Sequence, residues 1–307
     1  MRVDDRRHEV VERRFAIMGT TAHIVLTDAP VDLLDAAETY LRRCERRWSR
    51  FVATSELSVL NRSAGRLTLV SEATYRLVAL AINAWWSTGG AFDPTVHDAL
   101  CQLGYDRDFA SIGSSRAAPP PAPAPGCAGI ELFPPCRGVR LPSGVHLDLG
   151  GIAKGYAADR LVECLLEAGA AGACVNVGGD IRVEGCGPHD GPWVIALDHG
   201  QTVAPSRVAL VAGAVCTSSR ARRRWCVGSD EAHHLIDPRS GRSVDEGLAW
   251  VSVIARHAAQ AEVLTKAVFL AGPDIGRVLL EELGVAGVLV RDDNVIIEAG
   301  NLRELTA

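Results

Sequence analysis

Hydrophobic residues follow two different periods along the chain. Apolar positions recur every three or four residues over 33–48, from Ser71 to Gly89 and over 258–270, which predicts amphipathic helices. They alternate over 15–26, where Gly19 interrupts the pattern, and over 248–256, which predicts strands. Because helices and strands follow one another without a regular βαβ rhythm, we predict an α+β fold in one compact unit with two lobes.

Shorter segments complete this outline. Asp32 and Ser71 precede helices as candidate N-caps, and Pro273 begins a last helix. Residues 55–61 are expected to form a polar loop or turn, and residues 117–126 a proline-rich surface loop. Further strands are expected over 173–177, 193–198 and 207–215, with a hairpin formed by 139–141 and 145–149 and a final strand pair over 285–297.

Residues 147–159 have the pattern of a strand that stops at two glycines and opens into a helix ending at Gly169. A helix N-terminus presents free N–H groups and a partial positive charge. Lys154 adds a cation in the first turn, where it opposes the helix dipole, so an anionic ligand such as a phosphate would explain it. The alternative is a tight turn with an exposed lysine, because the stretch matches neither the dinucleotide fingerprint nor the P-loop.

Four other segments carry polar side chains suited to a ligand. Asp93 is held in extended geometry by the proline that follows it, and a second glycine pair leads into Asp180. Thr217 and Ser218 offer hydroxyl groups to phosphate or ribose oxygens, and a cluster of arginines follows them. His234 precedes an Asp-Pro-Arg-Ser-Gly turn and is suited to general-base work at neutral pH. Each segment also has a plain structural explanation, as an ordinary turn, a solvated basic face or a structural histidine.

The composition argues against several classes of protein. The 307 residues carry a net charge of −5 with scattered basic residues, which argues against a nucleic-acid-binding surface. No apolar run approaches the roughly 20 residues of a membrane span. The N-terminal segment is charged and lacks the apolar core of a secretory signal, and the nine cysteines form no Cys-x-x-Cys pair. Free thiols in a cytoplasmic protein are therefore expected.

Seven separated motifs together resemble the FAD:protein FMN transferases, the ApbE family. In chain order they are Met18-Gly19-Thr20, residues 55–61, Phe92-Asp93-Pro94-Thr95-Val96, residues 148–159, residues 176–180, Thr217-Ser218 and residues 234–241. The resemblance covers residues 15–290. It implies an α+β fold related to the T-fold, in one FAD-binding domain over 15–300 that follows an N-terminal tail over 1–14.

The resemblance also implies a reaction. Family members use FAD as a substrate together with Mg²⁺, split its pyrophosphate, and attach FMN to a Thr or Ser hydroxyl of an acceptor flavoprotein with release of AMP. By position His234 would be the base, and Lys154 would act on the pyrophosphate. The residues expected to contact FAD are Met18, Gly19, Asn61, Asp93, Lys154, Asp159, Gly178, Gly179, Asp180, Thr217, Ser218 and Arg220.

The late helix departs from the family pattern. The family binds Mg²⁺ through an Asp, a Thr four residues further on, and a main-chain carbonyl that corresponds to a position near Gly151. Here Glu262 and Lys266 stand at the two side-chain positions. A glutamate can ligate Mg²⁺ but a protonated lysine cannot, and its ammonium would take the cation's place or pair with Glu262.

Three hypotheses follow from this departure. The first is an FMN transferase whose metal is weakened or replaced by Lys266. The second is an FAD pyrophosphatase, in which water takes the place of the acceptor hydroxyl. The third is a non-catalytic FAD-binding protein that has lost its metal site.

Overall fold

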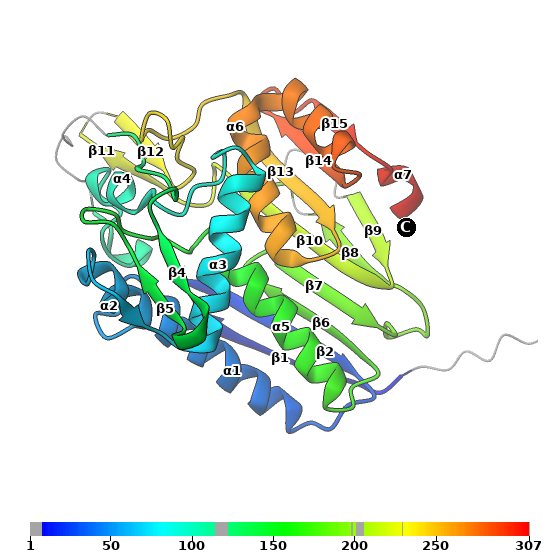
Figure 1. Cartoon of the computed structure of the whole chain (residues 1–307). Helices are drawn as coiled ribbons and strands as arrows, with labels where there is room; N and C mark the ends of the chain where they lie inside the picture. Colours follow the sequence, from blue (N-terminus) through cyan, green and yellow to red (C-terminus); the bar gives the residue numbers. More distant parts are fainter. Residues whose placement is uncertain (1–7, 114–121, 198, 201–205, 229, 307) are drawn as a thin grey trace, which may run out of the picture.

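An antiparallel sheet of eight strands forms the centre of the computed structural model, which describes residues 8–113, 122–197, 199–200, 206–228 and 230–306 (Figure 1). The strand order is β1-β2-β6-β7-β10-β13-β14-β15, and neighbouring strands are antiparallel throughout. The strands are β1 (Val10–Ile17), β2 (Thr20–Thr27), β6 (Gly172–Val177), β7 (Asp180–Gly185), β10 (Ala212–Ser219), β13 (Leu248–Ala255), β14 (Ala286–Arg291) and β15 (Ile296–Ala299).

Helices cover one face of this sheet. Helices α1 (Leu33–Trp48), α5 (Ala153–Glu167) and α6 (Ala258–Glu282) lie across it in Figure 1, and α3 (Glu72–Ser87) packs into the same core. The alternating side chains of β2 that face these helices, Ala22, Ile24 and Leu26, are fully buried. Apolar strand positions and apolar helix stripes therefore meet in the main core.

The opposite face carries a smaller core. The hairpin of β8 (Trp193–Leu197) and β9 (Ser206–Leu210) packs there together with α7 (Leu302–Leu305). Val183, Val215, Ile254 and Val288 supply the sheet side of this core. Because successive side chains of a strand point to opposite faces of the sheet, neighbouring residues of β10 enter different cores.

Small elements gather at one end of the sheet, on the left in Figure 1. They are α2 (Glu56–Arg62), α4 (His97–Gln102), two 3-10 turns, η1 (Phe109–Ser111) and η2 (Pro134–Cys136), the strands β3 (Thr68–Leu69), β4 (Glu131–Phe133) and β5 (Gly138–Arg140), and the hairpin of β11 (Arg224–Val227) and β12 (Asp230–His233). Trp225 and Tyr105 join the hairpin to α4 in a third apolar cluster. We call this group of elements the second lobe, although α2 and β5 also contribute Leu57, Leu60 and Val139 to the main core.

Most of the expected elements are confirmed. The helices over 33–48 and 258–270 and the helix after Ser71 are present, and the turn at Gly19 separates β1 from β2. Ser71 caps α3 by accepting a hydrogen bond from the Thr74 amide, whereas Asp32 makes no side-chain cap bond. The last helix continues α6 across a kink at the non-helical Gly272.

Three expectations are wrong. Residues 55–61 are not a loop, because Ser55 accepts from the Ser58 amide and caps α2. The expected hairpin is absent from the described residues, since β5 pairs with β3 and β4 and residues 145–149 form no strand. The expected strand over 207–215 is two strands, β9 and β10, because the strand is interrupted at Val211.

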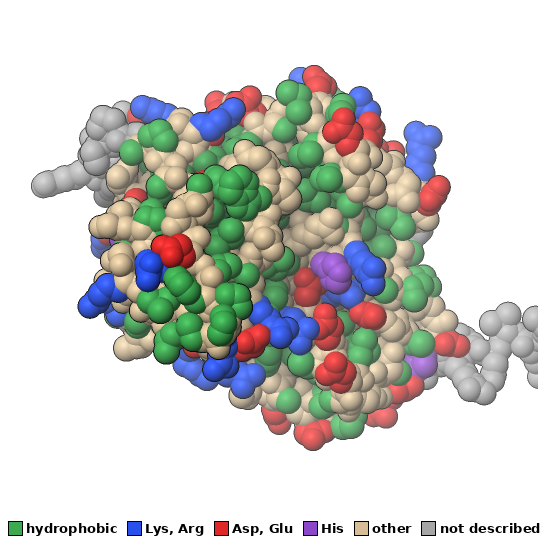
Figure 2. Space-filling view, in the orientation of Figure 1, with side chains coloured by type: hydrophobic (Ala, Val, Ile, Leu, Met, Phe, Trp, Pro, Cys, Tyr) green, Lys and Arg blue, Asp and Glu red, His purple; other side chains and the backbone are tan. Residues whose placement is uncertain are grey.

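Three expected segments lie partly outside the described residues. They are residues 1–7 of the N-terminal tail, residues 117–121 of the proline-rich loop and residue 198 of the expected strand over 193–198. Strand β1 already begins at Val10, inside the tail expected over 1–14. No described helix combines the length and apolarity needed to cross a membrane. Acidic and basic side chains are intermixed over the described part of the face shown in Figure 2.

Candidate functional site

Two tight turns meet at the end of the sheet that bears the second lobe. The β1–β2 turn contains Met18 and Gly19 at φ values of 50° and 63°, and the β6–β7 turn contains Gly178 and Gly179. The Gly178 amide donates to the Thr21 carbonyl at 3.1 Å, which holds the two turns together. A Cβ on Gly178 would lie 2.6 Å from the Thr20 hydroxyl oxygen, so this contact requires glycine.

The close crossing of α5 and α6 depends on Gly155. A Cβ at this position would lie 2.5 Å from the carbonyl carbon and oxygen of Ala258. The bare backbone lets the Gly155 amide donate to Glu262 Oε2 at 2.8 Å. A buried carboxylate therefore occupies the N-terminus of α5, where the sequence suggested a phosphate.

Four charged side chains form what we call the charge cluster: Lys154, Asp180, Glu262 and Lys266. Lys154 Nζ lies 2.8 Å from Asp180 Oδ2, forms a shorter ion pair with Glu262 Oε1, and donates to the Gly150 carbonyl at 3.3 Å. These contacts use all three N–H groups of Lys154. Lys266 Nζ lies 3.6 Å from Glu262 Oε1, beyond ordinary hydrogen-bond distance.

Burial and mutual charge set the pKa values in the charge cluster. Burial alone would lower the pKa of Lys154, but Asp180 and Glu262 outweigh it and raise that pKa. Burial would raise the pKa of Glu262, but the two ammonium groups hold it below its usual value. Burial and the charge of Glu262 raise the pKa of Asp180. Burial lowers the pKa of Lys266 against the opposing charge of Glu262.

Lys266 lies beside the paired glycines. Its Cε is 3.6 Å from the point that a Cβ on Gly151 would occupy, and the ring of Phe92 is 3.1 Å from the same point. The expected proximity of Lys266 to Gly151 is therefore present in the structure. The ammonium end of this side chain has the weakest contact with a partner of any charge in the cluster.

His234 lies close enough to the charge cluster for the charges of Lys266 and Lys154 to act on its imidazole. Its Nδ1 is buried and makes no hydrogen bond within the described part of the chain. Burial, followed by the charges of Arg223 and Lys266, lowers the pKa of His234 well below its usual value. The imidazole is therefore neutral at neutral pH and has an unshared nitrogen lone pair.

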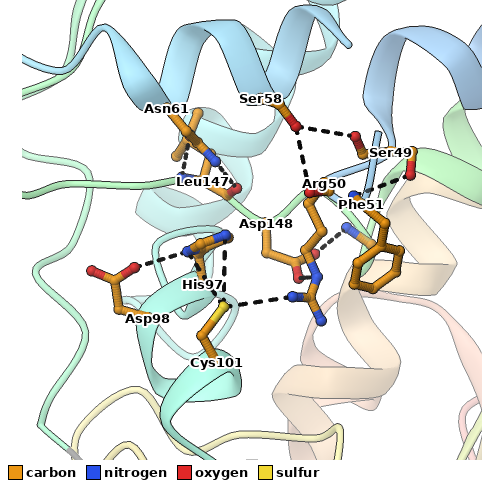
Figure 3. Close-up of polar contacts among 11 residues, drawn as sticks. Ser49, Arg50, Phe51, Ser58, Asn61, His97, Asp98, Cys101, Leu147 and Asp148 are labelled. Carbon is orange, nitrogen blue, oxygen red and sulfur yellow. Dashed lines mark hydrogen bonds and ion pairs between the residues drawn. The ribbon is translucent and has the colours of Figure 1, made fainter. Parts of the chain in front are cut away.

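Three of the expected FAD-contacting residues support the backbone around the site. Asn61 exchanges two hydrogen bonds with the main chain of Leu147, at 2.9 and 2.8 Å (Figure 3). Asp93 accepts from the Thr95 amide and hydroxyl at 2.7 and 2.6 Å and from the Trp85 indole at 3.0 Å. Asp159 accepts from the amides of residues 258 and 259, at 2.7 and 2.9 Å, and so caps α6. Burial raises the pKa of both Asp93 and Asp159.

The two hydroxyl residues at the end of β10 point to opposite faces of the sheet. Ser218 pairs with the Thr265 hydroxyl on α6 at 2.7 Å, next to the charge cluster. Thr217 pairs with the Ser252 hydroxyl at 2.7 Å on the other side. Because successive strand residues alternate in direction, the structure brings only Ser218 to the cluster side.

The arginines that follow β10 also point to different places. Arg220 is engaged by Asp245 at 2.7 Å and by a closer contact with Asp292. Arg222 reaches the Gly178 carbonyl at 3.5 Å, and Arg223 approaches Gly19. The arginines nearest the two turns are thus Arg222 and Arg223, and nothing in the sequence separates them from Arg220.

A cavity of about 800 Å³ opens between α3, α5 and α6, on another side of α6 from the charge cluster. Most of its lining is apolar, including Leu80, Val263 and Leu264. Of the site residues expected from the sequence, only Asp159 contributes to it. Because the charge cluster and His234 lie elsewhere, we take the cluster beside Gly151 as the candidate site.

Comparisons with known proteins define the class. The ApbE protein of Thermotoga maritima superposes with a TM-score of 0.86 at 27% identity, and the match covers 97% of this chain and 100% of that one. The ApbE family model matches residues 18–289. The chain therefore belongs to the ApbE family, and its mixed fold with one central sheet is the fold of that family.

Curated relatives agree with this assignment. The FAD:protein FMN transferase of Treponema pallidum is 29% identical over 286 residues, which is 85% of this chain and 77% of the relative. The enzyme of the same name from Haemophilus influenzae is 27% identical over 302 residues, covering 90% of this chain and 85% of the relative.

The residues present do not fit a Mg²⁺ ion at Gly151, Glu262 and Lys266. Mg²⁺ needs several oxygen ligands in near-octahedral geometry. Glu262 Oε1 contacts two ammonium groups and Oε2 accepts an amide N–H. The Thr265 hydroxyl is bonded to Ser218 and to the Glu262 carbonyl. An ammonium group thus stands where a cation would have to bind.

Proposed function

We propose that this chain transfers FMN from FAD to a Thr or Ser hydroxyl of an acceptor flavoprotein. The observation that carries the proposal is the neutral His234 beside the charge cluster, whose Nδ1 makes no hydrogen bond within the described residues, in a chain of the ApbE family. Relatives that align with most of the chain carry this activity in their names. The acceptor protein and the position of bound FAD are part of the proposal.

The reaction is a phosphoryl transfer. The acceptor hydroxyl oxygen attacks the FMN phosphorus of FAD and forms a new P–O bond. The P–O bond to the bridging oxygen breaks, and AMP leaves with that oxygen. The hydroxyl proton passes to the free lone pair of His234 and from there to solvent.

Binding of FAD prepares His234 for this role. Arg223 and Lys266 lower the pKa of His234 in the free protein, after the larger effect of burial. A pyrophosphate carries negative charge, so its arrival beside these cations offsets them and raises the pKa of the imidazole. The base is then strengthened only when the substrate is in place.

Lys266 supplies the positive charge that faces the pyrophosphate. Its ammonium is held loosely by Glu262 and lies beside Gly151, so it retains N–H donors for an anion. We infer that it takes the place of the Mg²⁺ of other family members and stabilises the charge that develops on the phosphorus oxygens. Lys154, whose donors are all used, positions Asp180 and Glu262.

The turns at Met18, Gly19, Gly178 and Gly179 contribute main-chain groups to the flavin dinucleotide. Arg222 and Arg223, which lie next to these turns, replace Arg220 as the arginines proposed to contact it. A cytoplasmic location stays a prediction, supported by nine cysteines that are all free thiols.

One assay tests the function. The protein is incubated with FAD and a peptide that bears the acceptor threonine, with and without Mg²⁺, and the products are analysed by mass spectrometry. The peptide is expected to gain FMN in both conditions, with release of AMP. Free FMN and AMP without labelled peptide would instead indicate a pyrophosphatase, and intact bound FAD without turnover a binding protein.

A double variant tests the part assigned to Lys266. Lys266→Thr with Glu262→Asp restores the family's ligand pair and is expected to make labelling depend on Mg²⁺. The matched control is Arg277→Thr with Glu281→Asp, which removes an exposed ion pair of 2.6 Å from the same helix. If the first variant gains no more Mg²⁺ dependence than the control, the placement of the metal position is wrong.

A further inference from the structure

A second cluster of ionisable side chains, which we call the histidine cluster, lies in the second lobe and consists of His97, Asp98, Cys101 and His146. His97 and Asp98 begin α4, Cys101 follows one turn later on the same helix, and His146 lies on the loop before Asp148. Figure 3 shows His97 between Asp98 and Cys101. The proposed FMN transfer uses none of the four residues of this cluster.

The donor atoms of His97, Asp98 and His146 lie close together, and Cys101 lies beside His97. Asp98 Oδ1 lies 2.8 Å from His97 Nδ1 and 2.9 Å from His146 Nδ1. These ligand atoms all lie within 4.8 Å of one another. Cys101 Sγ is 4.0 Å from His97 Nδ1 and 3.9 Å from its Nε2. Ligands of one tetrahedral ion, at about 2.0–2.3 Å from it, lie roughly 3–4 Å apart, so His97, Asp98 and His146 need only small movements and Cys101 a larger one.

The cluster is partly enclosed, and a guanidinium lies beside its thiol. The side chains of His97 and His146 are 20% and 32% exposed, so an ion could enter from solvent and still be largely enclosed. Arg50 Nη1 lies 3.7 Å from Cys101 Sγ, and Nη2 of the same guanidinium is buried without a partner in the described residues. Burial raises the pKa of the Cys101 thiol, and the positive charge of Arg50 opposes this shift.

We propose that His97, Asp98, His146 and Cys101 bind one divalent transition metal of the Zn²⁺ class. Two imidazoles, one carboxylate and one thiolate form a nitrogen, oxygen and sulfur set that suits Zn²⁺ and is poorly suited to Mg²⁺ or Ca²⁺. Binding releases the thiol proton to solvent and moves the imidazole protons to Nε2. The carboxylate and thiolate together neutralise the charge of the ion.

The site would join two segments of the second lobe. Asp98 and His146 are 48 residues apart in the chain. Arg50, which faces Cys101, also holds Asp148 Oδ2 at 2.8 Å, and Asp148 Oδ1 accepts from the Gly150 amide at 2.6 Å (Figure 3). A metal would therefore fix α4 against the chain that leads into the paired glycines.

Metal binding is tested on the full-length protein. Bound metal is removed from the protein with a chelator. The protein is then titrated with Zn²⁺ in competition with a chromophoric chelator, and separately with Co²⁺ while the absorption spectrum is recorded. We expect one tight equivalent and a thiolate-to-Co²⁺ band in the near ultraviolet. Cys101→Ser should abolish that band. His146→Gln and Asp98→Asn should weaken Zn²⁺ binding at least as much as the roughly 10–100-fold that loss of an outer-shell partner costs.

A second group on the chain provides the matched control. His8, Cys186 and Asp190 also offer ligand atoms within 4.8 Å, at a more exposed position. Cys186→Ser should leave Zn²⁺ affinity and the Co²⁺ spectrum unchanged. The proposal is overturned if no stoichiometric Zn²⁺ binds, if His146→Gln and Asp98→Asn bind as tightly as the parent, or if Cys186→Ser removes the site. Circular dichroism confirms that each variant is folded.

Discussion

The charge cluster beside Gly151 and the histidine cluster of α4 gather ionisable groups in opposite ways. In the charge cluster, two ammonium groups balance the charges of two carboxylates, and both oxygens of Glu262 already have partners. In the histidine cluster, one carboxylate, Asp98, is shared by two imidazoles that can lose or move their protons.

Ligand type alone therefore does not make a metal site. A carboxylate that is already neutralised by fixed cations has little to offer a hard ion such as Mg²⁺. A carboxylate held only by exchangeable protons can give them up to a metal. We therefore expect an internal cation at Lys266 and an external one at His97 and His146.

The same amide substitution in both clusters tests this contrast most strongly. Glu262→Gln leaves Lys154 and Lys266 buried with one carboxylate and is expected to lower the free energy of unfolding by about 3–5 kcal/mol. Asp98→Asn removes a half-exposed carboxylate and should cost at most about 1 kcal/mol, because solvent screens its charge. Denaturant titrations in a chelating buffer measure both.

The expected ranking has a clear counter-result. If Asp98→Asn costs as much as Glu262→Gln, the histidine cluster is a rigid ion-pair network rather than an adaptable ligand set. Glu281→Gln on the exposed side of α6 gives the background cost of the substitution in the same helix.

Histidine substitutions compare the two regions by rate. His234→Gln removes the proposed base and is expected to slow peptide labelling by about 10²–10⁴-fold. His146→Gln, outside the transfer site, should leave labelling without added metal unchanged. Single-turnover labelling with saturating FAD measures the step directly. Equal loss in both variants would remove the proposed role of His234 and point to a general effect on folding.

Much of the central fold could be predicted from the sequence because its signals are local. The alternation of β2, the apolar stripe of α1 and the Ser71 cap of α3 each depend on neighbouring residues. Residues 55–61 were expected to form a loop, because a short capped helix has too few apolar positions to show a period.

The sequence predicts which residues belong to the candidate site but not which of them contact one another. Lys154, Asp180 and Glu262 are identifiable from their motifs, but the ion pairs among them require α5 and α6 to cross at Gly155. The opposite directions of Thr217 and Ser218 depend on β10 continuing as a strand to Ser219. The histidine cluster joins α4 to a loop 48 residues away, a pairing that no local pattern contains.

Glycine substitutions compare how tightly each region is packed. Gly155→Ala places a methyl group 2.5 Å from the Ala258 carbonyl, where main chain must move, and is expected to cost about 3 kcal/mol. Gly144→Ala, two residues before His146, meets open space and carries only the strain of a φ of 78°, about 1 kcal/mol. Thermal and urea unfolding test the order. A smaller loss at Gly155 would mean that the α5–α6 crossing can relax.

The two regions are expected to lose their contributions to the free energy of unfolding in different pH ranges. The pKa of His234 in the folded protein lies below its unfolded value of about 6.5, so the unfolded state binds the extra proton first as pH falls. The free energy of unfolding should therefore fall below pH 6.5, with His234 contributing up to about 1.4 kcal/mol per pH unit until its folded pKa is reached. Hydrogen bonds from His97 and His146 outweigh burial and lower the pKa of Asp98, so its contribution is lost only below about pH 4. Urea titrations of the parent, His234→Gln and Asp98→Asn from pH 3 to 8 distinguish the two windows. If His234→Gln keeps the full slope between pH 5 and 6.5, the buried imidazole is not the group that titrates there, and its neutral state in the folded protein would have to be abandoned.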